Sequence, residues 1–274
     1  MKKFEGVLFC TDLDGTLYAD DKTVSAENLQ AIDYFRSEGG LFTFITGRVP
    51  CISQDICAVV RPNVPYGCAN GAAVYDPAVG RYLFSRFLPE QALELVRAVD
   101  AQLPDMGIQF NTENDVLFSK DNAAMERFRV LTGAPHKPCS HEGFAAPLLK
   151  VIFAHTDERR LAEVMRLCEQ HPAAEYVDFV HSEKTLYEIV PKGANKGAGL
   201  CKLAELLGVP LRRTVAVGDY HNDVPMLQQA GLSFAVQNAA DAAKAAARYR
   251  TVSNNDHAIA AIIDGLDRGA YPMD

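Results

Sequence analysis

Two aspartates stand one residue apart in the segment "FCTDLDGTLY", at positions 12 and 14, directly after an apolar run. Two like charges about 4 Å apart repel by roughly 4 kcal/mol at an effective dielectric constant near 20. A hard cation such as Mg2+ reverses the sign of this energy, because it prefers oxygen ligands and is often bound together with a substrate phosphate. The spacing of Asp12 and Asp14 therefore predicts a site for Mg2+ and an anionic substrate.

Three further polar clusters follow predicted buried strands or begin a predicted helix. In an open α/β sheet, ligands bind at the edge where the parallel strands have their carboxyl ends. We therefore expect the clusters to meet the aspartate pair at that edge. They are Thr46-Gly47-Arg48, Gly218-Asp219 with Asn222-Asp223, and Lys196 at the start of a helix.

The carboxylates of these clusters are expected to serve in different ways. Asp12 and Asp219 are the best candidates for side-chain ligands of Mg2+. The side chain of Asp14 is expected to point away from the ion, so its backbone carbonyl is the expected ligand. The Asp14 carboxyl group is then free to act as an acid or a base.

The elements that would position these clusters alternate along the chain. Residues 6–12 and 41–46 are short apolar runs, which are typical of buried parallel strands. Between them, Ser25 is a candidate N-cap for a helix that Gly39-Gly40 ends. This alternation predicts an α/β fold with a doubly wound parallel sheet. A helix is expected to begin at Pro50. Further elements are expected at 66–76, 195–207, 213–219, 222–231, 232–236, 239–247 and 249–253.

The pattern changes near residue 82. A helix is expected at 89–103, and short strand-like segments follow it, with another helix at 157–169. The segment "EYVDFV" alternates as a half-exposed antiparallel strand does. We therefore predict an inserted α+β domain at residues 83–188, and a core domain made of residues 1–82 and 189–274.

The composition excludes several classes of partner. Hydrophobic residues make up 48% of the chain and charged residues 23%, which is ordinary for a globular protein. The net charge of -8 makes a nucleic acid an unfavourable partner. No apolar run approaches 18 residues and the N-terminal segment lacks the pattern of a signal peptide, so we expect no membrane contact. Seven cysteines without a C-x-x-C motif favour reduced thiols in the cytoplasm.

The four motifs resemble those of the haloacid dehalogenase superfamily, in the same order along the chain. They read "DLDGT" at 12–16, "FITGR" at 44–48, "KGANKG" at 192–197 and "GDYHND" at 218–223. The ending "GDYHNDVPMLQQAG", the "ANGA" at 69–72 and the position of the insert resemble the Cof-like phosphatases, whose cap is of type II, subtype B. The resemblance spans nearly the whole chain and implies a Rossmann-like core with an inserted cap.

The resemblance also implies a reaction with covalent catalysis. Asp12 matches the nucleophile that forms an aspartyl-phosphate, and a carboxyl group with an ordinary pKa of about 3.9 is ionised at neutral pH. Asp14 matches the general acid for the leaving alcohol and then the base that activates water. Lys196 matches the cation that neutralises the charges of the phosphate and the nucleophile.

The remaining residues match the groups of the family that bind phosphate and metal. Thr46 and the amide of Gly47 match the phosphate-binding groups, and Asn222 matches a further phosphate contact. Asp219 matches the metal ligand, and Asp223 matches a carboxylate that supports it. The resemblance thus implies Mg2+ as cofactor, held by Asp12, Asp14 and Asp219.

The expected activity is hydrolysis of a small phosphorylated metabolite, of the sugar phosphate, pyridoxal phosphate or flavin mononucleotide type. The insert is expected to select the leaving group and the chain to be a monomer or a weak homodimer. A phosphomutase, or a phosphatase dedicated to sucrose phosphate or mannosyl-phosphoglycerate, is the alternative within enzymes. A non-catalytic ligand sensor is the alternative outside them. The sequence assigns no role to Arg48, Lys192 or His221.

Overall fold

The computed structural model describes residues 2–272, and the chain divides into two compact units. The core unit comprises the residues up to Thr46, Asp55–Phe84 and the residues from Asn195. The insert unit comprises Gly47–Gln54 and Ser85–Ala194. No helix within residues 2–272 combines the length and the apolar character that a membrane span requires.

The core unit is built on a parallel sheet of five strands in the order β13-β12-β11-β1-β2. Its central strand β1 pairs with β11 on one side and β2 on the other. Every residue of β1 and β11 is buried, as their continuous apolar runs require. The doubly wound parallel sheet is therefore confirmed. The strands are β1 (Leu8–Thr11), β2 (Leu41–Phe44), β11 (Thr214–Gly218), β12 (Leu232–Ala235) and β13 (Tyr249–Arg250).

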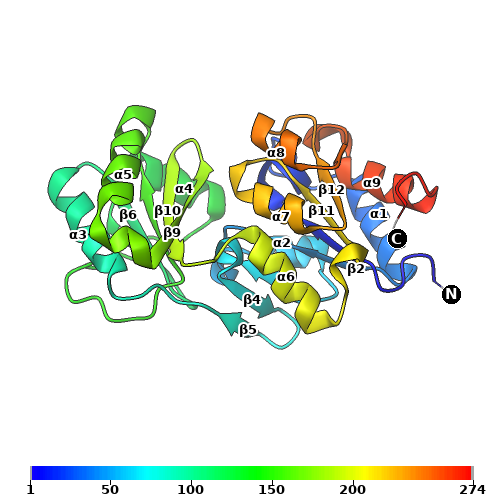
Figure 1. Cartoon of the computed structure of the whole chain (residues 1–274), viewed down its shortest axis with the longest axis horizontal. Helices are drawn as coiled ribbons and strands as arrows, with labels where there is room; N and C mark the ends of the chain where they lie inside the picture. The colour runs from blue at the N-terminus through cyan, green and yellow to red at the C-terminus, as the bar shows by residue number, and fades with distance from the viewer. Residues whose placement is uncertain (1, 273–274) are drawn as a thin grey trace. The chain divides into compact units, whose positions relative to one another are not determined.

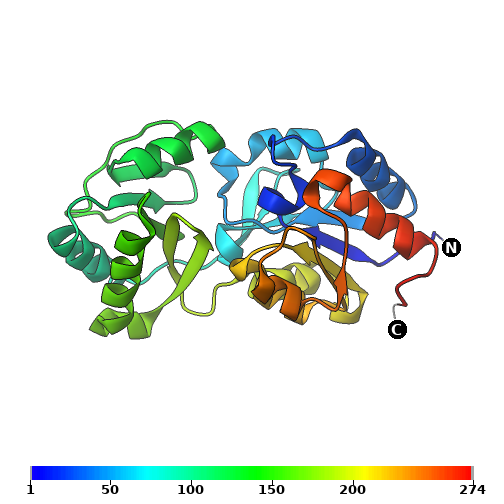
Figure 2. The same ribbon diagram turned by 90° about the horizontal axis from the view of Figure 1, so that it is seen from above.

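Helices cover this sheet in two pairs, α1 with α9 and α6 with α7, and Figure 2 shows them on two sides of the strands. As predicted, Ser25 caps α1, because its hydroxyl accepts a hydrogen bond from the amide of Asn28 at 3.2 Å. Gly208 ends α6 in the left-handed conformation. The helices are α1 (Ala26–Ser37), α2 (Gln54–Val60), α6 (Lys196–Leu207), α7 (Val224–Gln229), α8 (Asp241–Ala246) and α9 (Ala258–Asp267).

The segment "YGCANGAAVYD" forms a strand and a turn, but the strand does not join the large sheet. Strand β3 (Tyr66–Cys68) pairs with β4 (Ala73–Asp76) and lies in a separate sheet with β5 (Arg81–Ser85). A single parallel bridge, Ile45 to Gly67, links it to the end of β2. Pro50 opens a short 3-10 helix, Pro50–Ile52, ahead of α2.

The insert unit contains an antiparallel sheet in the order β7-β6-β8-β10-β9 (Figure 1). Helices α3 and α5 share one hydrophobic core with one face of this sheet. The α+β character predicted for this segment is confirmed, but helix α4, with Asn122 as its N-cap, was not predicted. The elements are α3 (Ala92–Gln102), β6 (Gly107–Asn111), β7 (Val116–Lys120), α4 (Ala123–Thr132), β8 (Lys150–Ala154), α5 (Glu158–Gln170), β9 (Val177–Glu183) and β10 (Leu186–Pro191).

The turn after β3 is packed against the start of α6. Three successive residues, Ala69–Gly71, have positive φ, which costs energy for the two that are not glycine. A β-carbon added to Gly71, whose φ is +83°, would lie 2.0 Å from the carbonyl oxygen of Asn195. Only glycine therefore fits at this position, and the turn holds the N-terminus of α6 in place.

This packing predicts that Gly71→Ala destabilises the protein far more than Gly208→Ala. Both glycines have positive φ, but a β-carbon at Gly208 meets nothing within 4 Å. The Gly208→Ala change should cost about 1–2 kcal/mol for the left-handed backbone. The Gly71→Ala change should cost roughly 3 kcal/mol or more. It carries the same cost of the left-handed backbone, and its β-carbon would also overlap the backbone of Asn195. Urea unfolding of both variants measures the difference, and equal losses would contradict the packing described.

Candidate active site

The predicted site residues of the core unit come together where neighbouring parallel strands end. Asp12 follows β1 and Asp219 follows β11, and the last residues of these strands are paired in register. Thr46 lies just beyond β2, on the other side of β1. The strand order thus places these three side chains at adjacent strand ends, as the sequence predicted.

Lys196 is the buried centre of this group. Its ammonium Nζ lies 2.5 Å from Oδ1 of Asp12 and 2.6 Å from Oδ1 of Asp223, and its side chain is 1% exposed. Asn195 caps the helix that carries Lys196, by accepting a hydrogen bond from the amide of Ala198 at 2.9 Å. A lysine at the first position of a helix therefore reaches two carboxylates that lie 27 and 184 residues away in sequence.

Both carboxylate oxygens of Asp223 accept hydrogen bonds from neighbouring donors. Its Oδ1 accepts from Lys196, and its Oδ2 accepts from the backbone amides of Asp219 at 2.9 Å and Tyr220 at 3.0 Å. A β-carbon on Gly218 would lie 2.5 Å from the Asp223 carboxyl carbon, so Gly218 leaves the room this arrangement needs. Asp223 therefore fixes both the lysine and the loop that carries Asp219.

The group has more negative charge than the lysine can balance. Carboxylate oxygens of Asp12, Asp219 and Asp223 all lie within 4.8 Å of one another. Burial raises the pKa of Asp12 well above its ordinary value, and the charges of Asp223 and Asp219 add to this rise against the opposing charge of Lys196. Burial and the charge of Asp223 likewise raise the pKa of Asp219 to about 7.

The same carboxylates keep Lys196 charged. Burial by itself lowers the pKa of a lysine, but the charges of Asp12 and Asp223 outweigh it and hold the pKa above its ordinary value. Three ionised carboxylates around one ammonium leave a formal charge of -2. In the described part of the chain, Asp12 and Asp219 each keep one carboxylate oxygen without a hydrogen-bond donor. The residues therefore fit a hard divalent cation.

Asp14 does not share in this cluster through its side chain. Its carboxylate belongs to a half-buried side chain and forms an ion pair with Lys22 at 3.0 Å. Residues Leu13–Leu17 form a tight turn directly after Asp12, in which Gly15 has a φ of +81°. The carboxyl group of Asp14 is thus outside the acidic cluster, where it could still exchange a proton.

Thr46 and Asn222 are connected by Asn70, a residue for which no role was predicted. The carbonyl oxygen of Thr46 accepts from the amide of Asn70 at 3.0 Å. The side-chain oxygen of Asn70 accepts from Nδ2 of Asn222 at 3.2 Å. Asn70 is fully buried and has a φ of +55°, which is uncommon outside glycine. The asparagine before a glycine in "ANGA" was the signal available in the sequence.

Two other neighbours complete the strand ends and were assigned no role from the sequence. The hydroxyl of Thr16 donates to Oδ1 of Asp219 at 2.9 Å. The side-chain amide of Asn238 donates to the carbonyl of Gly15 at 2.8 Å. The first contact fixes the turn that follows Asp12 relative to the end of β11, and the second fixes it relative to the segment after β12.

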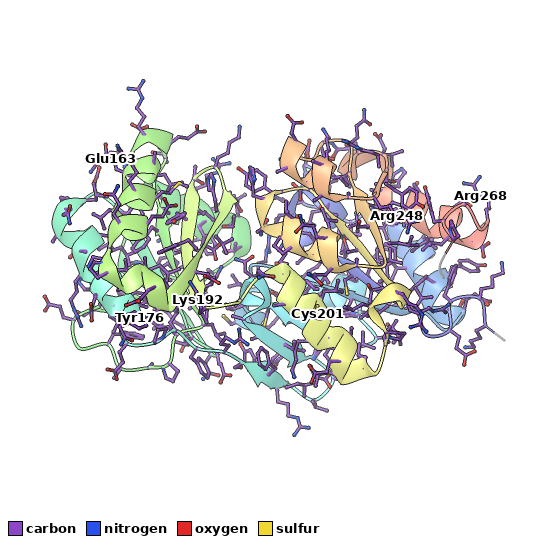
Figure 3. All side chains as sticks on the ribbon, in the orientation of Figure 1. Glu163, Tyr176, Lys192, Cys201, Arg248 and Arg268 are labelled. Atoms are coloured by element: carbon purple, nitrogen blue, oxygen red, sulfur yellow. The ribbon has the colours of Figure 1, made fainter. Side chains whose placement is uncertain are left out.

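The other polar residues named from the sequence are Gly47, Arg48, Lys192 and His221. Gly47 and Arg48 follow Thr46 directly and are grouped with the insert unit. Lys192, labelled in Figure 3, is 62% exposed and forms an ion pair with Asp178 at 3.1 Å. The ring of His221 packs edge-on against the ring of Tyr220.

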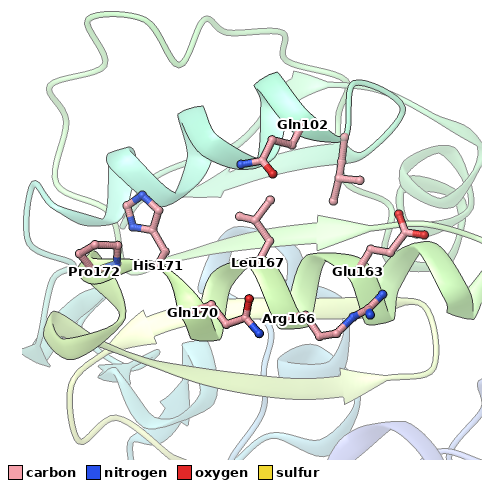
Figure 4. A pocket seen from close by; sticks show the side chains of 8 residues that line it. Gln102, Glu163, Arg166, Leu167, Gln170, His171 and Pro172 are labelled. Atoms are coloured by element: carbon pink, nitrogen blue, oxygen red, sulfur yellow. The ribbon is translucent and has the colours of Figure 1, made fainter.

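The insert unit also has a hollow of about 530 Å3 between α3 and α5 (Figure 4). Its side chains include one carboxylate, one guanidinium and one imidazole, but no group of carboxylates. It therefore lacks the chemistry of the acidic cluster, and we assign it no role. The lining residues are Gln102, Leu103, Glu163, Arg166, Leu167, Gln170, His171 and Pro172.

Comparison with known proteins agrees with this geometry. The family profile described as haloacid dehalogenase-like hydrolase matches residues 9–263. Two relatives from Bacillus subtilis bear the name 5-amino-6-(5-phospho-D-ribitylamino)uracil phosphatase. YitU is 31% identical over 92% of this chain and 94% of its own, and YwtE is 29% identical over 95% and 98%.

A solved structure supports the same fold. The subclass IIB sugar phosphatase BT4131 of the haloacid dehalogenase superfamily superimposes with a TM-score of 0.80. It is 20% identical in sequence, and the match covers 95% of this chain and 99% of that one. Because the identity is low, this likeness concerns the fold.

The raised pKa of Asp219 predicts that Mg2+ binds more tightly as the pH rises through about 7. Below that pH a proton occupies the carboxyl group and competes with the ion, and above it the carboxylate is free. Without the ion, the free energy of unfolding should fall as the pH rises from about 4 to 7. In this range the native state holds a proton on Asp219 that the unfolded state has lost.

Calorimetric titration of Mg2+ at pH 6, 7 and 8 checks this expectation. Asp219→Asn should weaken binding and reduce the pH dependence, since the amide does not titrate. A dissociation constant that stays the same from pH 6 to 8 in the unmodified protein would contradict the assignment of Asp219.

Proposed function

We propose that this chain, which belongs to the haloacid dehalogenase-like hydrolases and is a phosphatase of small phosphorylated compounds, acts through Mg2+ and an aspartyl-phosphate on Asp12. The observation that carries the proposal is the buried Lys196 ammonium shared by Asp12 and Asp223, with Asp219 beside them. This arrangement fixes one oxygen of Asp12 and leaves the other without a donor. The free oxygen is the nucleophile.

In the first step, the free carboxylate oxygen of Asp12 forms a bond to phosphorus while the bond from phosphorus to the leaving oxygen breaks. Asp14 gives its proton to that leaving oxygen, which departs as an alcohol. In the second step, Asp14 takes a proton from water as the water oxygen attacks phosphorus. The acyl-phosphate bond breaks, so that inorganic phosphate leaves and the Asp12 carboxylate returns.

The phosphate is held by the groups at the neighbouring strand ends. Lys196 offers a positive charge, Thr46 a hydroxyl, Gly47 an amide, and Asn222 a side-chain amide. Such donors stabilise charge that develops on the phosphoryl oxygens during transfer. Asn70 positions two of these residues, since it contacts the backbone of Thr46 and the side chain of Asn222.

The divalent ion would be held by the carboxylates of Asp12 and Asp219 and the carbonyl of Asp14, with Asp223 supporting them. When bound, Mg2+ supplies positive charge that offsets the repulsion between the carboxylates and the phosphate. The carboxylates alone carry a formal excess of two negative charges over Lys196, which supports this choice of cofactor. Asp12 then stays ionised, as a nucleophile must.

The substrate is proposed to be a small phosphorylated metabolite. The insert, residues 83–188, would select its leaving group. The core domain, residues 1–82 and 189–274, would perform the chemistry. The types considered are sugar phosphates, pyridoxal phosphate and flavin mononucleotide. The names of YitU and YwtE add 5-amino-6-(5-phospho-D-ribitylamino)uracil as the first compound to test. We propose a cytoplasmic enzyme that is a monomer or a weak homodimer.

The covalent mechanism predicts that Asp12→Asn lowers phosphate release at least ~10³-fold, a loss of about 4 kcal/mol of transition-state stabilisation. The amide keeps the size of the side chain but is no nucleophile. Asp33→Asn, on an exposed part of α1, is the matched control and should retain activity. Turnover and thermal melting are measured together, and near-normal turnover by a folded Asp12→Asn protein would rule out the aspartyl-phosphate.

The position of Asn70 predicts that it acts through Asn222. Asn70→Gly tolerates the positive φ but removes the acceptor of the 3.2 Å hydrogen bond. Inhibition by inorganic phosphate should weaken roughly 5- to 10-fold, as loss of one hydrogen bond gives. Asn70→Gly combined with Asn222→Ala should be no worse than Asn222→Ala alone. Independent, additive losses in this double-mutant cycle would refute the connection.

A further inference from the structure

A tight loop of the core unit, residues 19–23, brings Lys22 to the carboxyl group of Asp14. The ammonium Nζ of Lys22 lies 3.0 Å from Oδ1 of Asp14, eight residues away in sequence. Two backbone hydrogen bonds of 2.9 Å close the loop, one from the amide of Lys22 to the carbonyl of Ala19 and one from the amide of Ala19 to the carbonyl of Thr23. The chain thus folds back on itself, and a lysine outside the acidic cluster contacts the carboxyl group to which we assign the proton transfer.

The backbone of Lys22 is strained, since its φ is +64°. Glycine adopts this left-handed conformation without cost and asparagine adopts it more readily than most residues, so either would suit a loop that only turned the chain. Strain of this kind is typical of positions where a side chain serves a functional site. The side chains of Lys22 and Asp14 are 44% and 32% exposed, and ion pairs exposed to this degree contribute little to stability. Stability therefore does not account for a lysine at this position.

Two asparagines in the segment before α9 anchor the loop. Oδ1 of Asp20 accepts from Nδ2 of Asn254, and Oδ2 of Asp20 accepts from Nδ2 of Asn255, both at 3.0 Å. The backbone amide of Asp20 donates in return to Oδ1 of Asn255 at 3.0 Å. Asn254 is 3% exposed, and its Nδ2 also donates to the carbonyl of Tyr18 at 3.1 Å. The loop is therefore fixed to the body of the core unit on either side of residue 19.

The same anchor holds the turn that carries Asp14. Oδ1 of Asn238 accepts from the backbone amide of Asn254 at 3.0 Å, and Nδ2 of Asn238 donates to the carbonyl of Gly15 at 2.8 Å. Asn238 thus connects the residue after Asp14 with the segment that holds the Lys22 loop. Because both partners of the ion pair are tied to one segment, the core unit sets the distance between their backbones. Two unanchored surface side chains would not have this constraint.

We propose that Lys22 is a positioning residue for Asp14, whose ammonium group holds the carboxyl group in the orientation from which a proton reaches the leaving oxygen. This inference rests on the proposed function, in which Asp14 gives that proton, and it names the residue that directs the transfer. Proton transfer requires the donor within hydrogen-bond reach of the acceptor, and a side chain free to rotate spends little time there. Lys22 acts through Asp14 and forms no bond to the substrate.

The test compares two esters of similar shape, 4-nitrobenzyl phosphate and 4-nitrophenyl phosphate. The first releases an alcohol, which needs a proton, and the second releases an acidic phenol, which departs as an anion. The ratio kcat/KM is measured, because it reports the steps up to loss of the leaving group. Lys22→Met should lower this ratio roughly 10- to 100-fold for the 4-nitrobenzyl ester and less than about threefold for the 4-nitrophenyl ester. Lys22→Arg keeps the charge and the donor and should restore most of the loss.

Two further variants serve as controls. Lys3→Met removes another exposed lysine from an ion pair with an aspartate, Asp267, and should leave both kcat/KM values unaltered. Asp14→Asn removes the acid itself and should give the same selective loss by a larger factor. Lys22→Met should melt within about 2 °C of the unmodified protein, since an exposed ion pair adds little stability. Lower melting with equal losses on both esters would assign Lys22 to the architecture and overturn the proposal.

The remaining outcomes separate this inference from the proposed function. A selective loss in Asp14→Asn without one in Lys22→Met leaves the proposed function intact and refutes the positioning role, as does faster hydrolysis of the 4-nitrobenzyl ester by Lys22→Met. Equal losses on both esters in Asp14→Asn refute the acid role of Asp14, and this inference with it. If the unmodified protein hydrolyses neither ester, crystal structures decide, because the Asp14 carboxyl group should be displaced in Lys22→Met and remain in place in Lys22→Arg. A carboxyl group that keeps its position without Lys22 would refute the positioning role.

Discussion

The site depends on one interaction, the burial of the Lys196 ammonium between the carboxylates of Asp12 and Asp223. A buried charge is tolerated only when it is paired and hydrogen-bonded. The lysine therefore holds the two carboxylates in position, and they hold its ammonium group in position. The third carboxylate, Asp219, has no such partner, and its pKa rises to about 7 as a result of burial and the charge of Asp223. This excess of negative charge makes the cluster suited to a divalent ion and, through that ion, to a phosphate.

The fold supplies this arrangement by means of strand order and a strained turn. With β11, β1 and β2 adjacent and parallel, residues about 200 positions apart end at the same edge of the sheet. The turn at Ala69–Gly71 then joins three of the motifs, since Asn70 contacts Thr46 and Asn222 while Gly71 packs against Asn195. Positive φ at Ala69 and Asn70 is a local cost that this function explains.

The sequence was sufficient to predict the strands of the large sheet, the N-cap of α1 and the meeting of the motifs at one sheet edge. Buried parallel strands and the cap residue Ser25 have local signals. It could not show that β3 lies in a separate sheet with β4 and β5, since apolar runs do not specify which strands pair. Simple alternation would have put Asp12 and Asp14 on the same side of a strand. Strand β1 ends at Thr11, and the turn at Leu13–Leu17 then separates the two side chains, which alternation does not reveal.

The central claim is that one divalent ion balances the charge that Lys196 leaves uncompensated. Crystals soaked with Mn2+, diffracted near the manganese absorption edge, would locate the ion directly by anomalous scattering. The account predicts a single strong peak in the core unit, about 2.0–2.2 Å from carboxylate oxygens of Asp12 and Asp219. A peak bound by other residues, or no peak near this cluster at saturating Mn2+, would contradict it.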